Sequence, residues 1–204
     1  MAMIEVKDLT VRRGSRTIMS DLNVSLESGK ISAIVGPNGC GKSTLLGAIA
    51  GDISYQSGEI YFDTKPLSSL SLVDQASLRS VVLQERTYWL SYTAREVIEM
   101  GQPIEAQARI PAIAHALDMV DFLDQKVTTL SGGQAQRVDI ARALIRDSQI
   151  YLLDEPLAAQ DSQSQKRTIA LLTEMRDHGK TIVIVEHSDK SKLEWCDQVI
   201  DYPA

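Results

Sequence analysis

A glycine-rich run that ends in lysine, serine and threonine is the first stretch of this 204-residue chain suited to a specific chemistry. It matches the phosphate-loop pattern G-x-x-x-x-G-K-[ST], between an apolar segment and a helix-forming one. Its glycines let backbone N–H groups turn toward phosphate oxygens, and the following helix adds the positive end of its dipole. We expect these residues to bind a nucleoside triphosphate: Gly36, Pro37, Asn38, Gly39, Cys40, Gly41, Lys42, Ser43 and Thr44.

Two side chains of the loop and two acidic residues farther along the chain account for the expected reaction. Lys42 can reach the β- and γ-phosphates, and the Ser43 hydroxyl can bind Mg²⁺. Asp154 and Glu155 close an apolar strand, at the edge of a parallel sheet where ligands bind. We expect Asp154 to hold Mg²⁺ and Glu155 to orient and deprotonate the attacking water. The alternative is an acidic pair that only caps a helix.

A second anion-receiving helix start lies at residues 130–137, LSGGQAQR, where a serine N-cap and two glycines precede an amphipathic stretch. A single domain does not need two anion-binding helix starts to hold one triphosphate. A head-to-tail dimer uses both, because the second helix start of each copy then contacts the nucleotide held by its partner. The alternative is a capped surface helix. The residues expected to contact the partner's nucleotide are Ser131, Gly132, Gly133 and Gln134.

The elements that must position these residues alternate between strands and helices, which predicts a parallel sheet with helices on both faces. The expected strands are residues 31–35, 150–153 and 181–185, and the expected helices are 43–50, 138–145 and 163–176. Alternating segments in 2–30 and 58–63 predict a small antiparallel layer. The fold class is therefore α/β, a P-loop NTPase core with an N-terminal antiparallel β layer and an inserted α-helical lobe. We expect one domain, 1–204, with 1–85 and 149–204 as the core and 86–148 as the lobe, in which 109–123 has helical patterning.

Composition narrows the class of partner. The formal net charge is −6, which argues against nucleic acid as a ligand because a basic face is expected there. The two cysteines, Cys40 and Cys196, do not form a disulfide framework and are typical of a reducing cytosol. The chain has no run approaching about 18 apolar residues, so other chains must cross any membrane that it serves.

The order of these motifs along nearly the whole chain resembles the ATPases of the ABC family. The resemblance implies ATP and Mg²⁺ as cofactors, and it adds three site residues. Gln84 is implied to be the Q-loop glutamine, which senses Mg²⁺ and water. Asp161 is implied to be the aspartate of the dimer-spanning D-loop, and His187 the switch histidine on the γ-phosphate.

The same resemblance predicts the partners. These are a second copy of the ATPase subunit, polytopic permease subunits and, for an importer, a substrate-binding protein, with the chain peripheral to the cytoplasmic face of the cell membrane. Residues 67–72, 78–84 and 92–101 are similar to the ATPases of siderophore, haem and cobalamin importers. Two alternatives are a soluble ABC-type ATPase not coupled to transport and a P-loop kinase outside the family. The kinase leaves residues 130–134 and His187 unexplained.

Two residues depart from the family's pattern. ABC ATPases usually stack adenine on an aromatic residue near position 13, where this chain has Arg13. A guanidinium plane can also stack on a ring, so Arg13 is the candidate for that place. The alternatives are loose recognition of the base and an arginine that is merely exposed at the end of a strand. Cys40 stands inside the phosphate loop where alanine or serine is commoner, and we interpret it as a tolerated small residue.

Overall fold

The structure, a computed structural model, describes residues 4–83, 91–187 and 190–202. Its strands are β1 (Ile4–Arg13), β2 (Arg16–Leu26), β3 (Ile31–Val35), β4 (Ser57–Phe62), β5 (Lys65–Pro66), β6 (Arg79–Val82), β7 (Ile150–Asp154), β8 (Thr181–Glu186) and β9 (Gln198–Asp201). Its α-helices are α1 (Lys42–Ile49), α2 (Leu72–Leu78), α3 (Ala94–Glu99), α4 (Ile104–Gln107), α5 (Ile110–Ala116), α6 (Gly132–Leu144) and α7 (Ser162–Asp177). The α/β class and the two kinds of sheet predicted from the sequence are confirmed.

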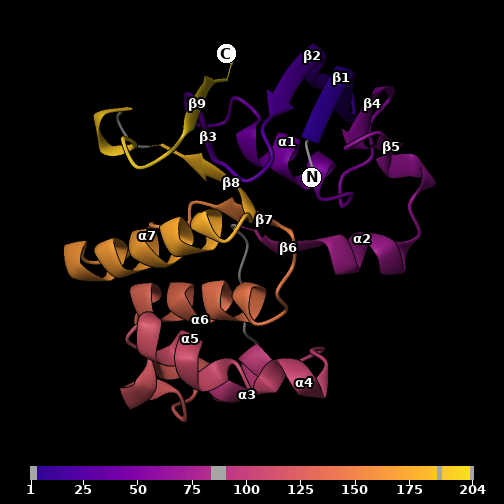
Figure 1. Ribbon diagram of the computed structural model, residues 1–204. Helices are drawn as coiled ribbons and strands as arrows, with labels where there is room; N and C mark the ends of the chain where they lie inside the picture. The colour runs from indigo at the N-terminus through magenta and orange to yellow at the C-terminus, as the bar shows by residue number, and fades with distance from the viewer. Residues whose placement is uncertain (1–3, 84–90, 188–189, 203–204) are drawn as a thin grey trace.

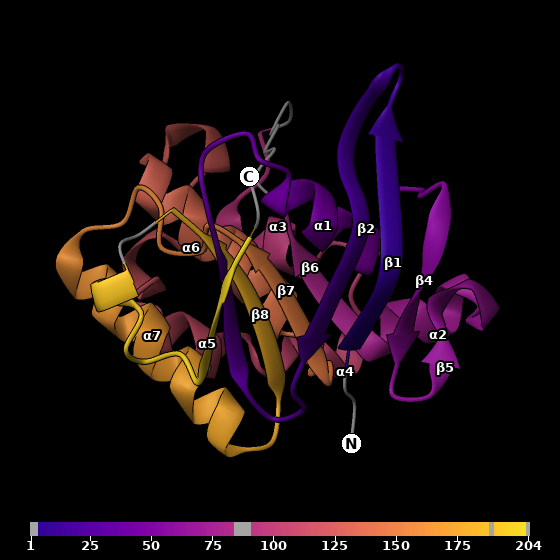
Figure 2. The same cartoon turned by 90° about the horizontal axis from the view of Figure 1, so that it is seen from above.

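A parallel sheet in the order β6-β7-β8-β3-β9 forms the centre of the molecule (Figure 2). Every residue of β3, β7 and β8 is buried, which explains why their sequences are continuous apolar runs. One face of the sheet packs on α1 and the antiparallel layer, and the other packs on α6 and α7. Because these strands are neighbours and parallel, their carboxyl ends bring the phosphate loop, Asp154 and His187 to one edge.

The antiparallel layer has the order β2-β1-β4-β5 and lies beside α1 (Figure 1). Buried and exposed residues alternate along much of β1, because one face of this layer covers the core and the other meets solvent. Gly58, at the start of β4, has a φ of 90°, and a Cβ there would lie 2.5 Å from the carbonyl oxygens of Lys7 and Asp8. Glycine is therefore required for β4 to pair with β1.

The helical lobe consists of α3 to α6, with α6 lying between β7 and the other three helices (Figure 1). The helical pattern of 109–123 is broken in the structure. The helix α5 ends at Ala116 because Asp118 adopts a left-handed conformation with a φ of 55°. Arg137 fixes this turn from α6 by donating to the carbonyls of Leu117 (3.0 Å) and Asp118 (2.8 Å). The expected helix 138–145 begins earlier than predicted, because a serine cap precedes Gly132.

None of the helices in the described part of the chain is long and apolar enough to cross a membrane.

Candidate functional site

The phosphate loop joins β3 to α1 and lines a cavity of about 460 Å³. Gly41, directly before α1, has a φ of 112°, and a Cβ there would lie 2.9 Å from the Ile18 side chain. A Cβ on Gly36 would lie 3.1 Å from the Tyr202 carbonyl oxygen. Gly41 is therefore required where the loop passes β2, and Gly36 favours the close approach of the loop to the end of β9. The sequence prediction of a strand, a tight loop and a helix is confirmed at this point.

Lys42 is the first residue of α1, directly after the loop, and is only 4% exposed. Its ammonium group donates to the carbonyl oxygens of Gly36 (2.8 Å) and Pro37 (2.9 Å) and contacts Nδ1 of His187 (3.1 Å). Because an ammonium group only donates, Nδ1 of His187 is the acceptor, and the imidazole proton is placed on Nε2. Nε2 in turn meets a carboxylate oxygen of Glu155. The predicted residues Lys42, His187 and Glu155 thus form one polar chain, although they come from three distant segments.

Asp154 ends β7 directly below the loop and is 2% exposed. Burial raises the pKa of its carboxyl group, while a hydrogen bond from Ser43 acts in the opposite direction. Its Oδ1 atom is buried and has no hydrogen-bond partner among the described residues. A buried carboxylate oxygen without a partner, beside a serine hydroxyl, suits a hard divalent cation. This geometry fits Mg²⁺ as the ion that Ser43 and Asp154 would hold.

Glu155 is the first residue after β7, and its backbone is left-handed with a φ of 49°. Its N–H donates to the Val185 carbonyl oxygen on β8 (3.0 Å), which ties it to the neighbouring strand. An unusual conformation in a non-glycine residue of this kind is typical of functional sites. The result is that the Glu155 carboxylate faces the cavity, whereas the Asp154 carboxylate is buried beneath it.

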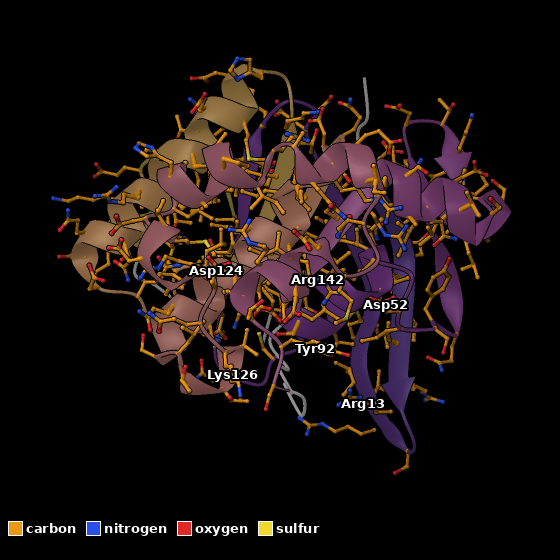
Figure 3. The ribbon with its side chains drawn as sticks, turned by 90° about the horizontal axis from the view of Figure 1, so that it is seen from below. Arg13, Asp52, Tyr92, Asp124, Lys126 and Arg142 are labelled. Carbon is orange, nitrogen blue, oxygen red and sulfur yellow. The ribbon has the colours of Figure 1, made fainter. Side chains whose placement is uncertain are left out.

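The open rim of the cavity belongs to the β1–β2 hairpin. Arg13, exposed at the end of β1 (Figure 3), lines the cavity, as expected for a base-stacking candidate. Arg16 and Ile18 on β2 also line it, and sequence reasoning missed both. The sequence did contain a signal for Arg16. The turn between the two strands is short, so Arg13 and Arg16 lie opposite each other in the antiparallel register. The rim therefore offers two guanidinium groups and one apolar side chain.

The start of α6 is built as a capping box. Ser131 accepts a hydrogen bond from the Gln134 N–H (3.2 Å), and the Gln134 side chain accepts one from the Ser131 N–H (2.9 Å). Ser131 and Gly132 are exposed, and neither is among the described residues that line the cavity around Lys42. Within one chain, the structure therefore does not bring the two predicted anion-binding devices together.

Asp161 caps α7. Its carboxylate accepts from the N–H groups of Gln163 (2.9 Å) and Ser164 (3.0 Å) and from the Ser164 hydroxyl (2.7 Å), and the hydrogen bonds from Ser164 lower its pKa. Its implied contact across a dimer stays a prediction. Gln84, which the resemblance also implies, follows Leu83 in the sequence and lies outside the described residues.

Comparison with known proteins places these features in a family. A family profile described as ABC transporter matches residues 19–158. The hemin import ATP-binding protein HmuV of Rhodococcus jostii is 36% identical over 202 residues, which cover 94% of this chain and 68% of that protein. The manganese transport system ATP-binding protein MntB of Listeria monocytogenes is 34% identical over 205 residues, which cover 97% of this chain and 85% of that protein.

The fold is also found among solved structures. A bacterial Atm1-family ABC exporter with ATP bound superposes with a TM-score of 0.90 at 23% identity, over 99% of this chain and 37% of the exporter chain. At that identity the likeness shows the fold alone. The haemin import relative agrees with the resemblance to siderophore, haem and cobalamin importer ATPases that the sequence indicated, whereas the name of the second relative refers to manganese transport.

Proposed function

This chain belongs to the ABC transporter family, whose members bind and hydrolyse ATP to power transport, and we propose that two copies work head to tail around two ATP molecules. The observation that carries the proposal is that the two anion-binding segments, the phosphate loop and the helix start at Ser131, lie apart within one chain. Lys42, Glu155 and His187 line one cavity, while the capped helix start at Ser131 is exposed elsewhere. A second copy would bring its own Ser131 to the nucleotide and complete the site.

The polar chain around Lys42 supports a mechanism for nucleotide binding. All three N–H donors of the ammonium group are used, on two loop carbonyls and on His187. A triphosphate in the loop offers better acceptors, because its oxygens are negatively charged and attract the ammonium group more strongly than two neutral carbonyls and a neutral imidazole do. Lys42 would then turn to the phosphates and release Nδ1 of His187. The ring would then be free to turn, so that its Nε2–H leaves Glu155 and donates toward the γ-phosphate, as a switch that responds to nucleotide.

Glu155 would act on the attacking water. Its carboxylate faces the same cavity, and its backbone is fixed by the bond to Val185. It would accept the proton of the water as the new bond to phosphorus forms and the bond to the leaving ADP oxygen breaks. Ser43 and Asp154, with Gln84 as the third predicted ligand, would hold Mg²⁺, which neutralises phosphate charge.

A groove of about 650 Å³, lined among others by Val82 and Leu83 just before Gln84 in the sequence, supports a docking place for the membrane subunits. It lies between the core and α6, and Asp52 from the core and Arg142 from α6 border it (Figure 3). Arg79 in its wall donates to the Gln75 side chain (2.9 Å) and to the Ala50 carbonyl. Its Nε and Nη1 atoms are buried without a hydrogen-bond partner among the described residues. An acidic or carbonyl group of a permease loop would suit this guanidinium.

The relatives favour import over export. Their names refer to haemin import and manganese transport, so we propose that this chain powers the uptake of a metal or metal chelate. Separate permease subunits would then form the channel, with this chain peripheral on their cytoplasmic face. A substrate-binding protein would deliver the cargo on the other side.

The test compares Glu155→Gln with the wild-type chain in ATPase activity and in size on a gel-filtration column. Removal of a general base typically slows turnover about 10²- to 10⁴-fold, so the variant should bind ATP and accumulate as an ATP-held dimer. Ser131→Arg on the Glu155→Gln background is the matched control. It should bind ATP but stay monomeric, because charge and bulk then fill the interface. A double variant that still dimerises with ATP would refute the head-to-tail arrangement.

Co-purification with a polytopic membrane protein then tests the transport role. Recovery of permease subunits with the wild-type chain, lost on Arg79→Ala, supports the groove as their docking place. An ATPase that is active and dimeric but brings down no membrane protein under conditions that preserve such complexes would favour the ABC-type ATPase not coupled to transport.

A further inference from the structure

Gln136 lies on α6, five residues after the N-cap Ser131, and is completely buried. Its side-chain Nε2 donates to the backbone carbonyl oxygen of Glu155 at 3.3 Å. Its Oε1 atom has no hydrogen-bond partner among the described residues. The bond to Glu155 therefore orients this amide, and it joins the capped helix to the backbone of the predicted general base.

A second contact on the same face of α6 supports this connection. Gly133 is three residues before Gln136, so the two face the same side of the helix. A Cβ on Gly133 would lie 2.6 Å from the Ala159 carbonyl oxygen, so only glycine lets the helix come so near. The start of α6 thus touches the segment 155–160 at both of its ends.

That segment is itself stiff, which allows it to pass on a displacement. The Glu155 carbonyl also accepts from the Ala158 N–H (3.1 Å), and Ala159 has a left-handed φ of 56°. The buried Gln160 donates to the Pro156 carbonyl (2.8 Å) and accepts from the Thr168 hydroxyl on α7 (3.1 Å). A movement of α6 would therefore shift the turn as one unit.

We propose that Gln136 is a positioning residue that links engagement of the Ser131 helix start to the alignment of Glu155 in the same chain. The proposal rests on the head-to-tail arrangement. When the partner's ATP binds at Ser131, α6 is fixed, and Gln136 fixes the backbone of Glu155 with it. Each active site thereby becomes competent only when the other nucleotide is in place, and the two ATP molecules are used in a coupled way.

The test variant removes the hydrogen-bond donor of Gln136 but keeps the volume of the side chain. Gln136→Met loses the hydrogen bond to Glu155 but has similar length and packs well in a buried site. Loss of one such bond should lower kcat by roughly three- to tenfold, while the KM for ATP and the ATP concentration at half-maximal dimer formation stay within about twofold. Activities are normalised to ATP bound per chain, so that a poorly folded fraction does not count.

Gln165→Met is the matched control. Gln165 is also a glutamine whose Nε2 donates to carbonyls of the same segment, at Leu157 (3.1 Å) and Gln160 (3.3 Å), but it comes from α7. The variant Gln165→Met should lower thermal stability but should not lower kcat selectively. Gln136→Leu, which also lacks a donor and brings no charge into the buried site, replaces Gln136→Met if that variant does not fold, and should show the same fall in kcat.

Three outcomes contradict the coupling. The first is an unchanged kcat in a folded Gln136 variant whose wild-type parent forms the ATP dimer, which refutes the coupling alone. The second is an equal fall in kcat for Gln165→Met, which would indicate general loosening of the turn. The third is a wild-type chain that stays monomeric with ATP, which refutes the head-to-tail proposal and the coupling with it.

Discussion

Asp154→Asn is expected to make the nucleotide-free protein more stable and the nucleotide-bound protein less so. The wild-type carboxylate is 2% exposed, and its Oδ1 atom has no hydrogen-bond partner among the described residues. Burial raises its pKa, so the charged form is disfavoured by folding. Asparagine has nearly the same shape and can keep the bond from Ser43, but it carries no charge.

The size of the effect follows from the burial. An unsatisfied buried polar group costs about 1–3 kcal/mol, and more when it is charged. Asparagine still leaves amide N–H groups without a partner, so we expect a net gain of about 1 kcal/mol. For a chain of this size, that raises the melting temperature by about 2–4 °C.

The sign of the pH dependence is fixed by the raised pKa. In the wild type, the cost of the charge is full above the raised pKa of the folded state, and it declines to zero as pH falls from there to the lower pKa of the unfolded chain. The stability advantage of Asp154→Asn should therefore shrink as the solution is made acidic. A group with a lowered pKa would show the opposite trend.

The assay is thermal unfolding with and without ATP and Mg²⁺. Bound ligand stabilises the folded state by RT ln(1 + [L]/Kd), so the wild type, which should bind Mg²⁺ with ATP more tightly, should gain more from them than Asp154→Asn does. Asp124→Asn is the control, because Asp124 is an exposed partner of Arg95 in the helical lobe (Figure 3). A nucleotide-free Asp154→Asn protein that melts below the wild type, or one that gains as much from Mg²⁺ and ATP, would refute this reasoning.

Two further predictions concern residues that depart from the family's pattern. The Cys40 sulfur lies close to Gly36 in the phosphate loop, whereas burial raises the pKa of the Cys196 thiol to about 12 and so suppresses its reaction near neutral pH. Maleimide should therefore inhibit the ATPase, ATP should protect it and Cys40→Ala should resist; equal sensitivity of Cys40→Ala would point to Cys196. Arg13→Ala and Arg16→Ala should each raise the KM for ATP only a few-fold with kcat nearly unchanged, since a cation–π stack at an exposed site is worth roughly 0.5–1 kcal/mol. Arg13→Tyr should restore binding, and GTP should be accepted within about tenfold of ATP. A hundredfold preference for ATP in a competition assay would show that a further contact reads the edge of the base.

Local sequence determined the fold class and the phosphate loop. Runs such as Ile31–Val35 and Ile150–Asp154 are apolar throughout because they are buried on both faces, and this pattern is visible without any tertiary information. The loop is equally local, because its glycines, Lys42 and the following helix are neighbours in the chain. The pair Asp154 and Glu155 was predictable for the same reason, since both follow a strand whose carboxyl end faces the loop.

Only the tertiary structure decided how distant residues meet. The contact between Lys42 and His187 joins residues 145 positions apart, and it depends on β3 and β8 being neighbours in the sheet. The residue Gln136 looks like any polar position of an amphipathic helix, yet it is buried against Glu155 because α6 packs on the turn after β7. Arg16 reaches the cavity rim because a hairpin pairs it with Arg13. These contacts depend on chain reversal and sheet order, which are set by the packing of the whole core rather than by any short run of residues.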